Sequence, residues 1–274
     1  MLARWRLINC CLLLIAGSIL ISAESRVQAE DAKLEPGFVS IFNGKDLTGW
    51  HKNPEKIGHG TGGRWAVEEG AITGEQDPPG SGNGGILLTD RKFTDFELEI
   101  DLKPDWGVDS GLFLRANDKG QCFQMMVDYH EAGNVGHIYG EGTGGFNTRP
   151  FDIHGEYDEG KKLIRLLTRS SKEVPENTFT ISGADWVKAW KLNDWNRAKV
   201  RVKGNPPQIT TWINGMKVNE FDGENYTGPR YDRKKVTETL GGSGSIAVQV
   251  HGGKSAWPEG AKCRWKTIRI RELK

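Results

Sequence analysis

The strictest constraint in this sequence is the alternation between Phe96 and Lys103, which reads FELEIDLK. Every second side chain is apolar, and charged side chains fall between them. Because neighbouring residues of a β-strand point to opposite faces of the sheet, this pattern predicts a strand with one dry face. A dry face needs a second layer to cover it, so the first expectation is a two-layer β fold.

Other segments carry similar signals. Two apolar-rich runs, Ser110–Arg115 and Phe123–Tyr129, are separated by Asn-Asp-Lys-Gly, which predicts a tight turn. We expect both runs to form an antiparallel meander with the Phe96–Lys103 strand, with Glu, Asp, Gln and Arg on its second face. Asn214-Gly215 predicts a further hairpin, because both residue types tolerate positive φ. More alternating runs follow at NRAKVRVKG (196–204), SIAVQVHGG (245–253) and WKTIRIREL (265–273).

About a dozen short strands, linked mostly by hairpins and without a βαβ rhythm, predict an all-β fold of two packed antiparallel sheets. Residues 140–196 are poorly periodic, and we interpret them as a long loop insertion at one end of the domain. Within them, Ala184–Leu192 is the best candidate for a short helix, because Trp186 and Trp190 lie four residues apart. Residues 222–244, rich in Gly and charge, are expected to form a loop.

The N-terminal residues have the three-part organisation of a secretory signal. Two arginines precede an apolar run from Leu7 to Ile21, and Val27-Gln28-Ala29 offers small residues for cleavage. The apolar run is shorter than the roughly 20 residues that a membrane-spanning helix needs. We therefore predict a signal peptide over residues 1–29, a single domain over 30–274 with no membrane span, and export to the periplasm or the medium.

The charge balance bears on the class of binding partner, and the cysteine content bears on disulfide formation. The whole chain has 37 Lys and Arg against 36 Asp and Glu, and loss of residues 1–29 leaves a net charge of −1. Nucleic-acid binding would call for a basic excess, so we predict no nucleic-acid partner. Cys122 and Cys263 remain after cleavage, either as a disulfide or as two buried thiols.

Two polar residues stand out at strand ends. Asp128 and His251 each close an apolar run beside a glycine-bearing turn, where a side chain can meet a ligand without full burial. Histidine exchanges protons near neutral pH, and an aspartate can orient it or act as the base itself. Both are candidate catalytic residues, although Asp128 could instead bond turn amides. Candidate substrate-binding residues nearby in sequence are Ser110, Gln124, His137, Tyr139 and Gln249.

Arg115, Trp106 and Trp195 are further candidates. Arg115 could polarise a carbonyl oxygen, or it could close a salt bridge to Glu99 or Asp101. Trp106 and Trp195 could stack on sugar rings, or could serve as core residues. The remaining loop histidines lack the short spacing of a zinc site and are expected at the surface; they are His51, His59 and His154.

The carboxylates of the alternating strand permit a different hypothesis. Glu97, Glu99 and Asp101 are spaced two apart, and retaining glycosidases use two carboxyl groups roughly 5 to 5.5 Å apart. The order Glu-x-Glu-x-Asp differs from the Glu-x-Asp-x-Glu of jelly-roll glycosidases. A solvated strand face is the alternative interpretation.

Taken in order, the landmarks resemble the 3-keto-disaccharide hydrolase family over nearly all of the chain after the signal segment. They are IFNGKDLTGW, WAVEEGAITG, FELEIDLK, DSGLFLR, WNRAKVRVKG, TWINGMKV, GSIAVQVHGG and WKTIRIREL. The family's HG motif falls on His251 and Gly252, and its SG-x-x-x-R motif falls on Ser110, Gly111 and Arg115. The strand that reads Glu-x-Gln followed by Asp in many members is FQMMVD here, so the spacing between Gln124 and Asp128 departs from the family pattern.

The resemblance implies a concanavalin-like jelly roll that cleaves glycosides oxidised to a ketone at carbon 3. The ketone acidifies the hydrogen on carbon 2, so a base can remove it and the anomeric group can leave before water adds. His251 or Asp128 would be the base, and Arg115, or a divalent metal ion held by carboxylates, would steady the enolate. No cofactor is certain. The alternative is a non-catalytic carbohydrate-binding domain of the same fold, because fold kinship does not decide function.

Overall fold

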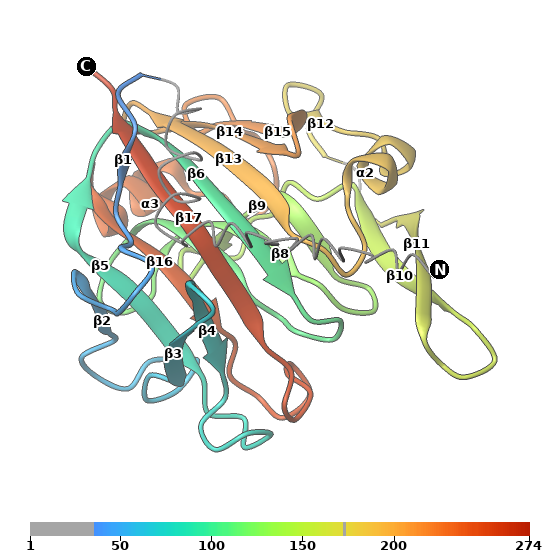
Figure 1. Ribbon diagram of the computed structural model, residues 1–274. Helices are drawn as coiled ribbons and strands as arrows, with labels where there is room; N and C mark the ends of the chain where they lie inside the picture. Colours follow the sequence, from blue (N-terminus) through green and yellow to red (C-terminus); the bar gives the residue numbers. More distant parts are fainter. Residues whose placement is uncertain (1–35, 172–173) are drawn as a thin grey trace, which may run out of the picture. The chain divides into compact units, whose positions relative to one another are not determined.

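The computed structural model describes residues 36–171 and 174–274, and the compact β-rich unit runs from Gly37 to Lys274. The predicted signal peptide, residues 1–29, lies outside the described residues. Within the described part of the chain, no helix has the length and apolar character needed to cross a bilayer. Strands dominate, as predicted, and the sheets are antiparallel (Figure 1).

The larger sheet has nine strands, with β6 near its centre. The order is β12-β15-β14-β13-β6-β17-β4-β3. β1 pairs with β17 at Arg269 and Ile270. The register matches the alternation of the sequence, because Leu98 and Ile100 of β6 lie opposite Val200 and Ala198 of β13. The strands are β1 (Val39–Ser40), β3 (Arg64–Glu68), β4 (Ala71–Glu75), β6 (Phe96–Pro104), β12 (Phe179–Thr180), β13 (Asn196–Lys203), β14 (Gln208–Ile213), β15 (Met216–Asp222) and β17 (Cys263–Glu272).

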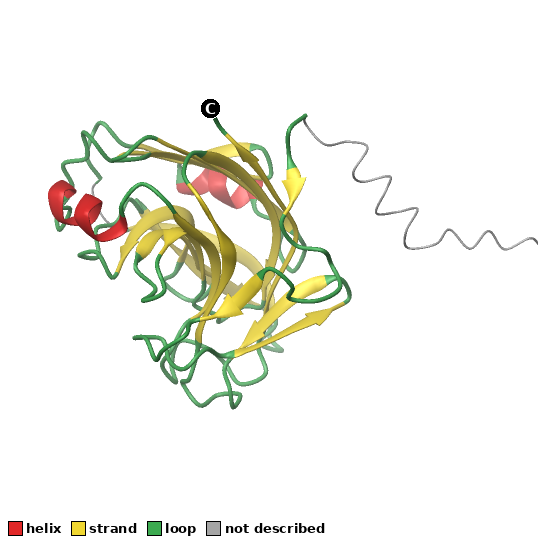
Figure 2. Ribbon diagram, turned by 90° about the vertical axis from the view of Figure 1, so that its left-hand side faces the viewer, coloured by secondary structure: helices red, strands yellow, loops and turns green. Residues whose placement is uncertain are grey.

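The second sheet has six strands in the order β2-β5-β16-β7-β8-β9. It stacks against the larger sheet, and Figure 2 shows the strands in two layers. Its strands are β2 (Trp50–Lys52), β5 (Gly85–Phe93), β7 (Gly111–Ala116), β8 (Cys122–Asp128), β9 (Asn134–Glu141) and β16 (Gly244–Val250). The core lies between the sheets and takes Leu98 and Ile100 from one side and Leu112 and Val248 from the other.

The expected meander is wrong in one respect, because β6 does not pair with β7. β6 pairs with β13 and β17, whereas β7 pairs with β8 and β16. The chain therefore crosses from one sheet to the other between Pro104 and Gly111. The physical reason is that the dry faces of β6 and β7 line the same core from opposite sheets, which a side-by-side pairing would not achieve.

Residues 140–171 and 174–196 form the expected elaboration, but with regular structure of their own. β10 (Phe151–Tyr157) and β11 (Leu163–Ser170) make a two-stranded sheet, and α2 (Gly183–Ala189) contacts β11. The predicted short helix is thus confirmed. Ser182 begins it by accepting a hydrogen bond from the backbone N–H of Asp185, and Trp186 is buried on its inner side.

A second helix, α3 (Arg233–Leu240), lies in the segment expected to be a loop, so that prediction is wrong. Asp232 caps its N-terminus, and Gly241, with a φ of 63°, ends it. Val236 and Leu240, four residues apart, bury one face. Only two apolar residues among eight mark the helix, so its sequence looks like a charged loop.

The two cysteines of the described residues, Cys122 and Cys263, are unpaired and buried. Cys122 lies on β8 in the six-stranded sheet, and Cys263 lies on β17 in the nine-stranded sheet. The interpretation as two buried thiols is therefore confirmed.

Arg115 ties the connections at one end of the two sheets together. Its guanidinium is fully buried and donates to the carbonyl oxygens of Thr94, at 2.7 Å, and Gly204, at 2.8 Å. A third bond, of 2.9 Å, joins it to the carboxylate of Asp95. Thr94 and Asp95 connect β5 to β6, and Gly204 lies in the β13–β14 turn. One buried cation thus holds three segments that are distant in sequence.

We predict that Arg115→Ala lowers the free energy of unfolding by about 3 to 5 kcal/mol, because it leaves a partly buried carboxylate and two carbonyls without their donor. Arg91→Ala, which removes an exposed ion pair to Glu272, should cost less than about 1 kcal/mol. Urea denaturation measures both. Equal losses for the two variants would contradict the assigned role.

Candidate active site

Three strand ends of the six-stranded sheet converge at Asp109. Residue Val108 bridges Tyr129 just beyond the paired part of β7 and β8, which sets the end of β8 beside the start of β7. On the other side, the backbone N–H of His251 donates to the carbonyl of Asp109 at 3.2 Å. β16 and β8 flank β7 in the sheet, so His251 lies on one side of Asp109 and Asp128 on the other.

The side chains at this point face away from the core. Val127 and Tyr129 of the β8 segment are core residues, so the residues between and beside them point to the opposite face. That face is apolar at one end, where Phe113 and Ile86 belong to a small separate cluster. Its other end is polar and partly open to solvent, since Asp109 and His130 keep 24% and 30% of their side-chain surface exposed.

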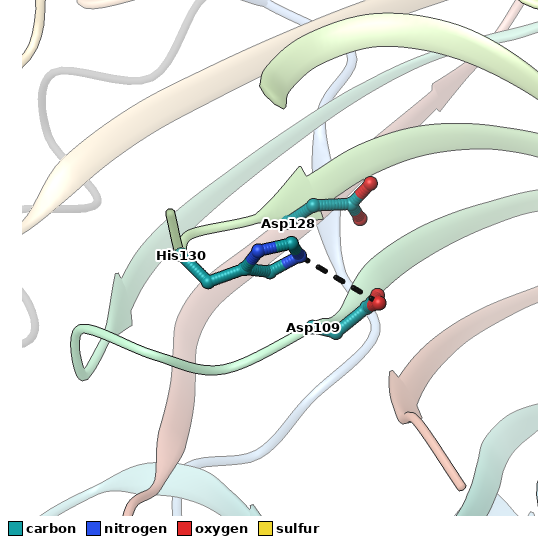
Figure 3. Close-up of side chains that lie close together, drawn as sticks. All are labelled: Asp109, Asp128 and His130. Atoms are coloured by element: carbon teal, nitrogen blue, oxygen red, sulfur yellow. Dashed lines mark ion pairs between the residues drawn. The ribbon is translucent and has the colours of Figure 1, made fainter. Parts of the chain in front are cut away.

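Asp109, Asp128 and His130 form the centre of the polar end (Figure 3). One ligand-type atom from each residue lies within 4.8 Å of the others. Nε2 of His130 is 3.7 Å from Oδ2 of Asp109. Its other ring nitrogen, Nδ1, lies 2.9 Å from the carbonyl oxygen of Glu131.

The pKa values of Asp109 and Asp128 are shifted in opposite directions. Burial opposes ionisation of Asp109, but the contact with His130 and the field of His251 outweigh it and hold its pKa below the usual range. Burial, and then the charge of Asp109, raises the pKa of Asp128 well above its ordinary value. Burial disfavours the charged form of His130, but Asp109 raises its pKa. Neighbouring carboxyl groups with opposite shifts are typical of acid–base sites.

His251 is held in one tautomer. Its Nδ1 lies 2.5 Å from the carbonyl oxygen of Gly252, which can only accept, so Nδ1 carries the proton. Nε2 is then the unprotonated nitrogen of the neutral ring. This is the form that can take a proton from a substrate.

His59 was expected at the surface, and this is wrong: only 9% of it is exposed. Its Nε2 lies 3.0 Å from the amide nitrogen of Gln249 and 3.4 Å from the carboxylate of Glu141. Its ring meets that of His251 edge-on, with 4.6 Å between centroids. The loop can approach because residue 252 is glycine; a Cβ there would lie 2.3 Å from the carbonyl oxygen of His59.

Several predicted binding residues share this face. The amide of Gln124 donates to the carbonyl of Ser110, at 3.2 Å, and to the side-chain oxygen of Gln249, at 3.3 Å. The hydroxyl of Ser110 donates to the backbone carbonyl of Gln249 at 2.6 Å, which holds β7 to β16. Gly111 leaves room for Gln124, whose amide nitrogen would lie 2.3 Å from an added Cβ. Tyr139 is the cross-strand neighbour of Gln124.

The structure does not bring Arg115 to this cluster. It lies at the opposite end of β7, and its salt bridge is to Asp95 rather than to Glu99 or Asp101. Because three hydrogen bonds and full burial occupy the guanidinium, it cannot meet a substrate carbonyl. The enolate must be stabilised by other groups.

The two tryptophans also lie elsewhere. Trp106 donates its indole N–H to the hydroxyl of Tyr157 at 2.7 Å and packs edge-on against Tyr129, on the core side. Trp195 lies beside the larger sheet, with the ammonium of Lys266 4.3 Å from its ring centroid. Neither ring is placed to stack on a sugar at Asp109.

The carboxylates of β6 do not form a glycosidase pair. Glu97 binds Arg271, and Asp101 binds Arg197 at 2.8 Å. They lie, with Glu99, on the face of the nine-stranded sheet that points away from the core, because the residues between them are core residues. The structure therefore rejects the retaining-glycosidase hypothesis and supports that of an ion-paired strand face.

The predicted site residues do not include Asp109, His130, Glu141 or His59, although the sequence groups Asp109 with Ser110 and Arg115, and His130 with Gln124 and Asp128. The first three could have been found by extending the period of two by one step: Asp109 precedes Gly111 by two, His130 follows Asp128 by two, and Glu141 follows Tyr139 by two. His59 has no such signal, because a returning loop places it.

The protein is an all-β sandwich of two antiparallel sheets, with acid–base groups at the ends of its central strands. Residues 37–271 match the family described as the 3-keto-alpha-glucoside-1,2-lyase-like domain. Since the match covers most of the chain, the protein belongs to this family.

Individual relatives are more distant. A 3-keto-disaccharide hydrolase of Bacteroides thetaiotaomicron is 34% identical over 88 residues, which are 30% of this chain and 28% of that protein. A crystal structure from Parabacteroides distasonis, provisionally assigned as a glycosyl hydrolase, has a TM-score of 0.51 at 20% identity and covers 86% of this chain and 99% of its own. β-Agarase B of Zobellia galactanivorans has a TM-score of 0.47 at 16% identity, over 82% and 85%. The Parabacteroides likeness supports the fold.

His137, a predicted binding residue, is buried beneath the face rather than on it. It is 0% exposed, its Nδ1 lies 2.8 Å from the side-chain oxygen of Asn134, and its ring packs edge-on against Phe151. Burial, with a smaller effect from Arg149, lowers its pKa to about 3. It is therefore a neutral structural residue at pH 7.

We predict that His137 makes the fold acid-sensitive. The unfolded state binds a proton near pH 6.5 and the folded state only near pH 3, so stability is lost as pH falls through this window, by about 1.4 kcal/mol per unit. In His137→Gln the slope of unfolding free energy against pH should be lower by about that amount. Identical slopes for the variant and the parent in urea titrations would contradict this.

Proposed function

We propose that this protein cleaves glycosides whose sugar carries a ketone at carbon 3, by elimination across carbons 1 and 2 followed by addition of water. Family membership supports the substrate class. The observation that carries the proposal is the juxtaposition, on one solvent-accessible face, of a histidine with a free Nε2 and a carboxyl–histidine cluster. A 3-keto glycoside needs this combination of a base and a stabiliser of negative charge.

The steps balance without an oxidant or reductant. The base takes the proton from carbon 2, and the electron pair of that C–H bond forms a C2–C3 double bond while the carbonyl becomes an enolate. The enolate then restores the ketone, forms a C1–C2 double bond and breaks the bond from carbon 1 to the aglycone oxygen, which takes up a proton. Water adds across C1–C2 to give the free 3-keto sugar.

His251 is the base in this scheme. Nδ1 is fixed by the carbonyl of Gly252, so Nε2 receives the proton, and the ionised Asp109 beside it stabilises the imidazolium that results. Asp109, Asp128 and His130 form the other half of the site, where the oxygen on carbon 3 needs a proton or a cation. This cluster replaces Arg115 in the role of stabiliser.

Amide and hydroxyl groups along the same face suit the remaining sugar hydroxyls. Tyr139 and Glu141 on β9 are partly exposed on this face, and the amides of Gln124 and Gln249 lie buried behind them on β8 and β16. The hydrogen bonds from Gln124 to Gln249 and from Gln249 to His59 fix the amide orientations before a ligand binds. Preorganised polar groups of this kind favour binding because little order is lost on association.

The test is turnover of both anomers of a p-nitrophenyl 3-keto-glucoside. We expect His251→Ala to lower kcat by about 10² to 10⁴-fold, the usual contribution of a general base, with a smaller change in KM. His51→Ala is the matched control: that histidine pairs with Asp90 on an exposed edge and should keep parental kinetics.

Undiminished turnover by His251→Ala would remove the histidine from the mechanism. If the parent protein binds the keto-glucoside and cleaves neither anomer, the chain is a carbohydrate-binding domain, and the proposed enzymatic function is wrong.

A further inference from the structure

The spacing of Asp109 and His130 does not suit a direct hydrogen bond. Nε2 of His130 and Oδ2 of Asp109 are 3.7 Å apart, whereas hydrogen-bonded nitrogen and oxygen lie about 2.7 to 3.2 Å apart. Two ligands that each lie about 2.1 Å from one metal ion at a wide angle are separated by a distance of this size. The separation suits an atom between them.

The imidazole is also held as a metal ligand requires. Nδ1 of His130 lies 2.9 Å from the carbonyl oxygen of Glu131, so Nδ1 carries the proton of the neutral ring. Nε2 is left without a proton, and Figure 3 shows this ring nitrogen pointing toward the carboxylate of Asp109. Ligand histidines are commonly oriented by donating their second ring N–H to a backbone carbonyl or a carboxylate.

Asp128 supplies an independent observation. Its Oδ1 is buried and has no hydrogen-bond partner among the residues that the structure describes. An acceptor without a donor is costly when removed from water. This oxygen belongs to the group whose ligand atoms all lie within 4.8 Å of one another. A cation would satisfy it.

We propose that Asp109, Asp128 and His130 bind one divalent transition-metal ion, Mn²⁺ or Zn²⁺. Two carboxylates and one imidazole suit these ions, and three protein ligands leave positions open for substrate. Within the proposed function, on which this second part rests, an ion held by these three residues would supply positive charge for the enolate oxygen on carbon 3, while His251 takes the proton from carbon 2.

Electrostatics around the site are compatible with a dication. The positive charge of Arg149 is felt by Asp128 and His130. Its guanidinium forms a salt bridge with Asp152, with 2.8 Å between the nitrogen and the oxygen. Glu141 adds a further negative charge felt by Asp128.

The test uses the full chain, stripped with EDTA and titrated with Mn²⁺ or Zn²⁺ alone, without substrate. We expect one ion per chain by elemental analysis and calorimetry. The electron paramagnetic resonance spectrum of Mn²⁺ should broaden on binding. Asp128→Asn and His130→Ala should each raise Kd by at least about 10 to 100-fold, since even groups behind the ligands contribute that much. His51 pairs with a single carboxylate, that of Asp90, so His51→Ala should bind the ion as the parent does.

Absence of stoichiometric metal, or binding unchanged in both ligand variants with circular dichroism like the parent's, would overturn the site. Stoichiometric metal without turnover of either keto-glucoside anomer would keep the site and overturn the proposed function. Full turnover by protein that is free of metal would keep the proposed function and overturn the role of the ion in it.

Discussion

The site depends on the pairing register of three central strands. Val108 bridges Tyr129, and the N–H of His251 bonds the carbonyl of Asp109, so the ends of β7, β8 and β16 meet at one point of the sheet. Because side chains alternate along a strand, a slip of one residue in any of these pairings would turn the polar cluster into the core. The burial of Val127 and Tyr129 beneath the site opposes such a slip.

The same register explains how acid–base groups can lie next to a densely packed core. Beneath the face lie the apolar residues shared by the two sheets, and above it the loop around His59 limits access of water to Gln249 and His251. Burial, and then the charge of Asp109, raises the pKa of Asp128, whereas His130 and His251 hold the pKa of Asp109 down against the effect of its own burial. The acid–base properties of the site thus depend both on its depth in the fold and on the two histidines beside it.

Much of the fold could be predicted because its signals are local. The alternation of β6 and the hairpin at Asn214-Gly215, whose φ angles are 50° and 83°, depend only on neighbouring residues. The partner of β6, the helix α3 and the position of Arg115 could not be predicted, since each depends on contacts between distant segments. In the site, period-two spacing places Asp128 and His251 on one face, whereas His59 arrives through a loop that no periodicity marks.

The central claim is that the bond to hydrogen at carbon 2 breaks during cleavage. The most direct measurement compares kcat/KM for a 3-keto-glucoside with hydrogen and with deuterium at that carbon. This account predicts slower cleavage of the deuterated sugar and a 3-keto-1,2-ene product in the early phase of the reaction. Equal rates, with the free sugar formed directly and no unsaturated intermediate, would contradict elimination and indicate displacement by water at carbon 1.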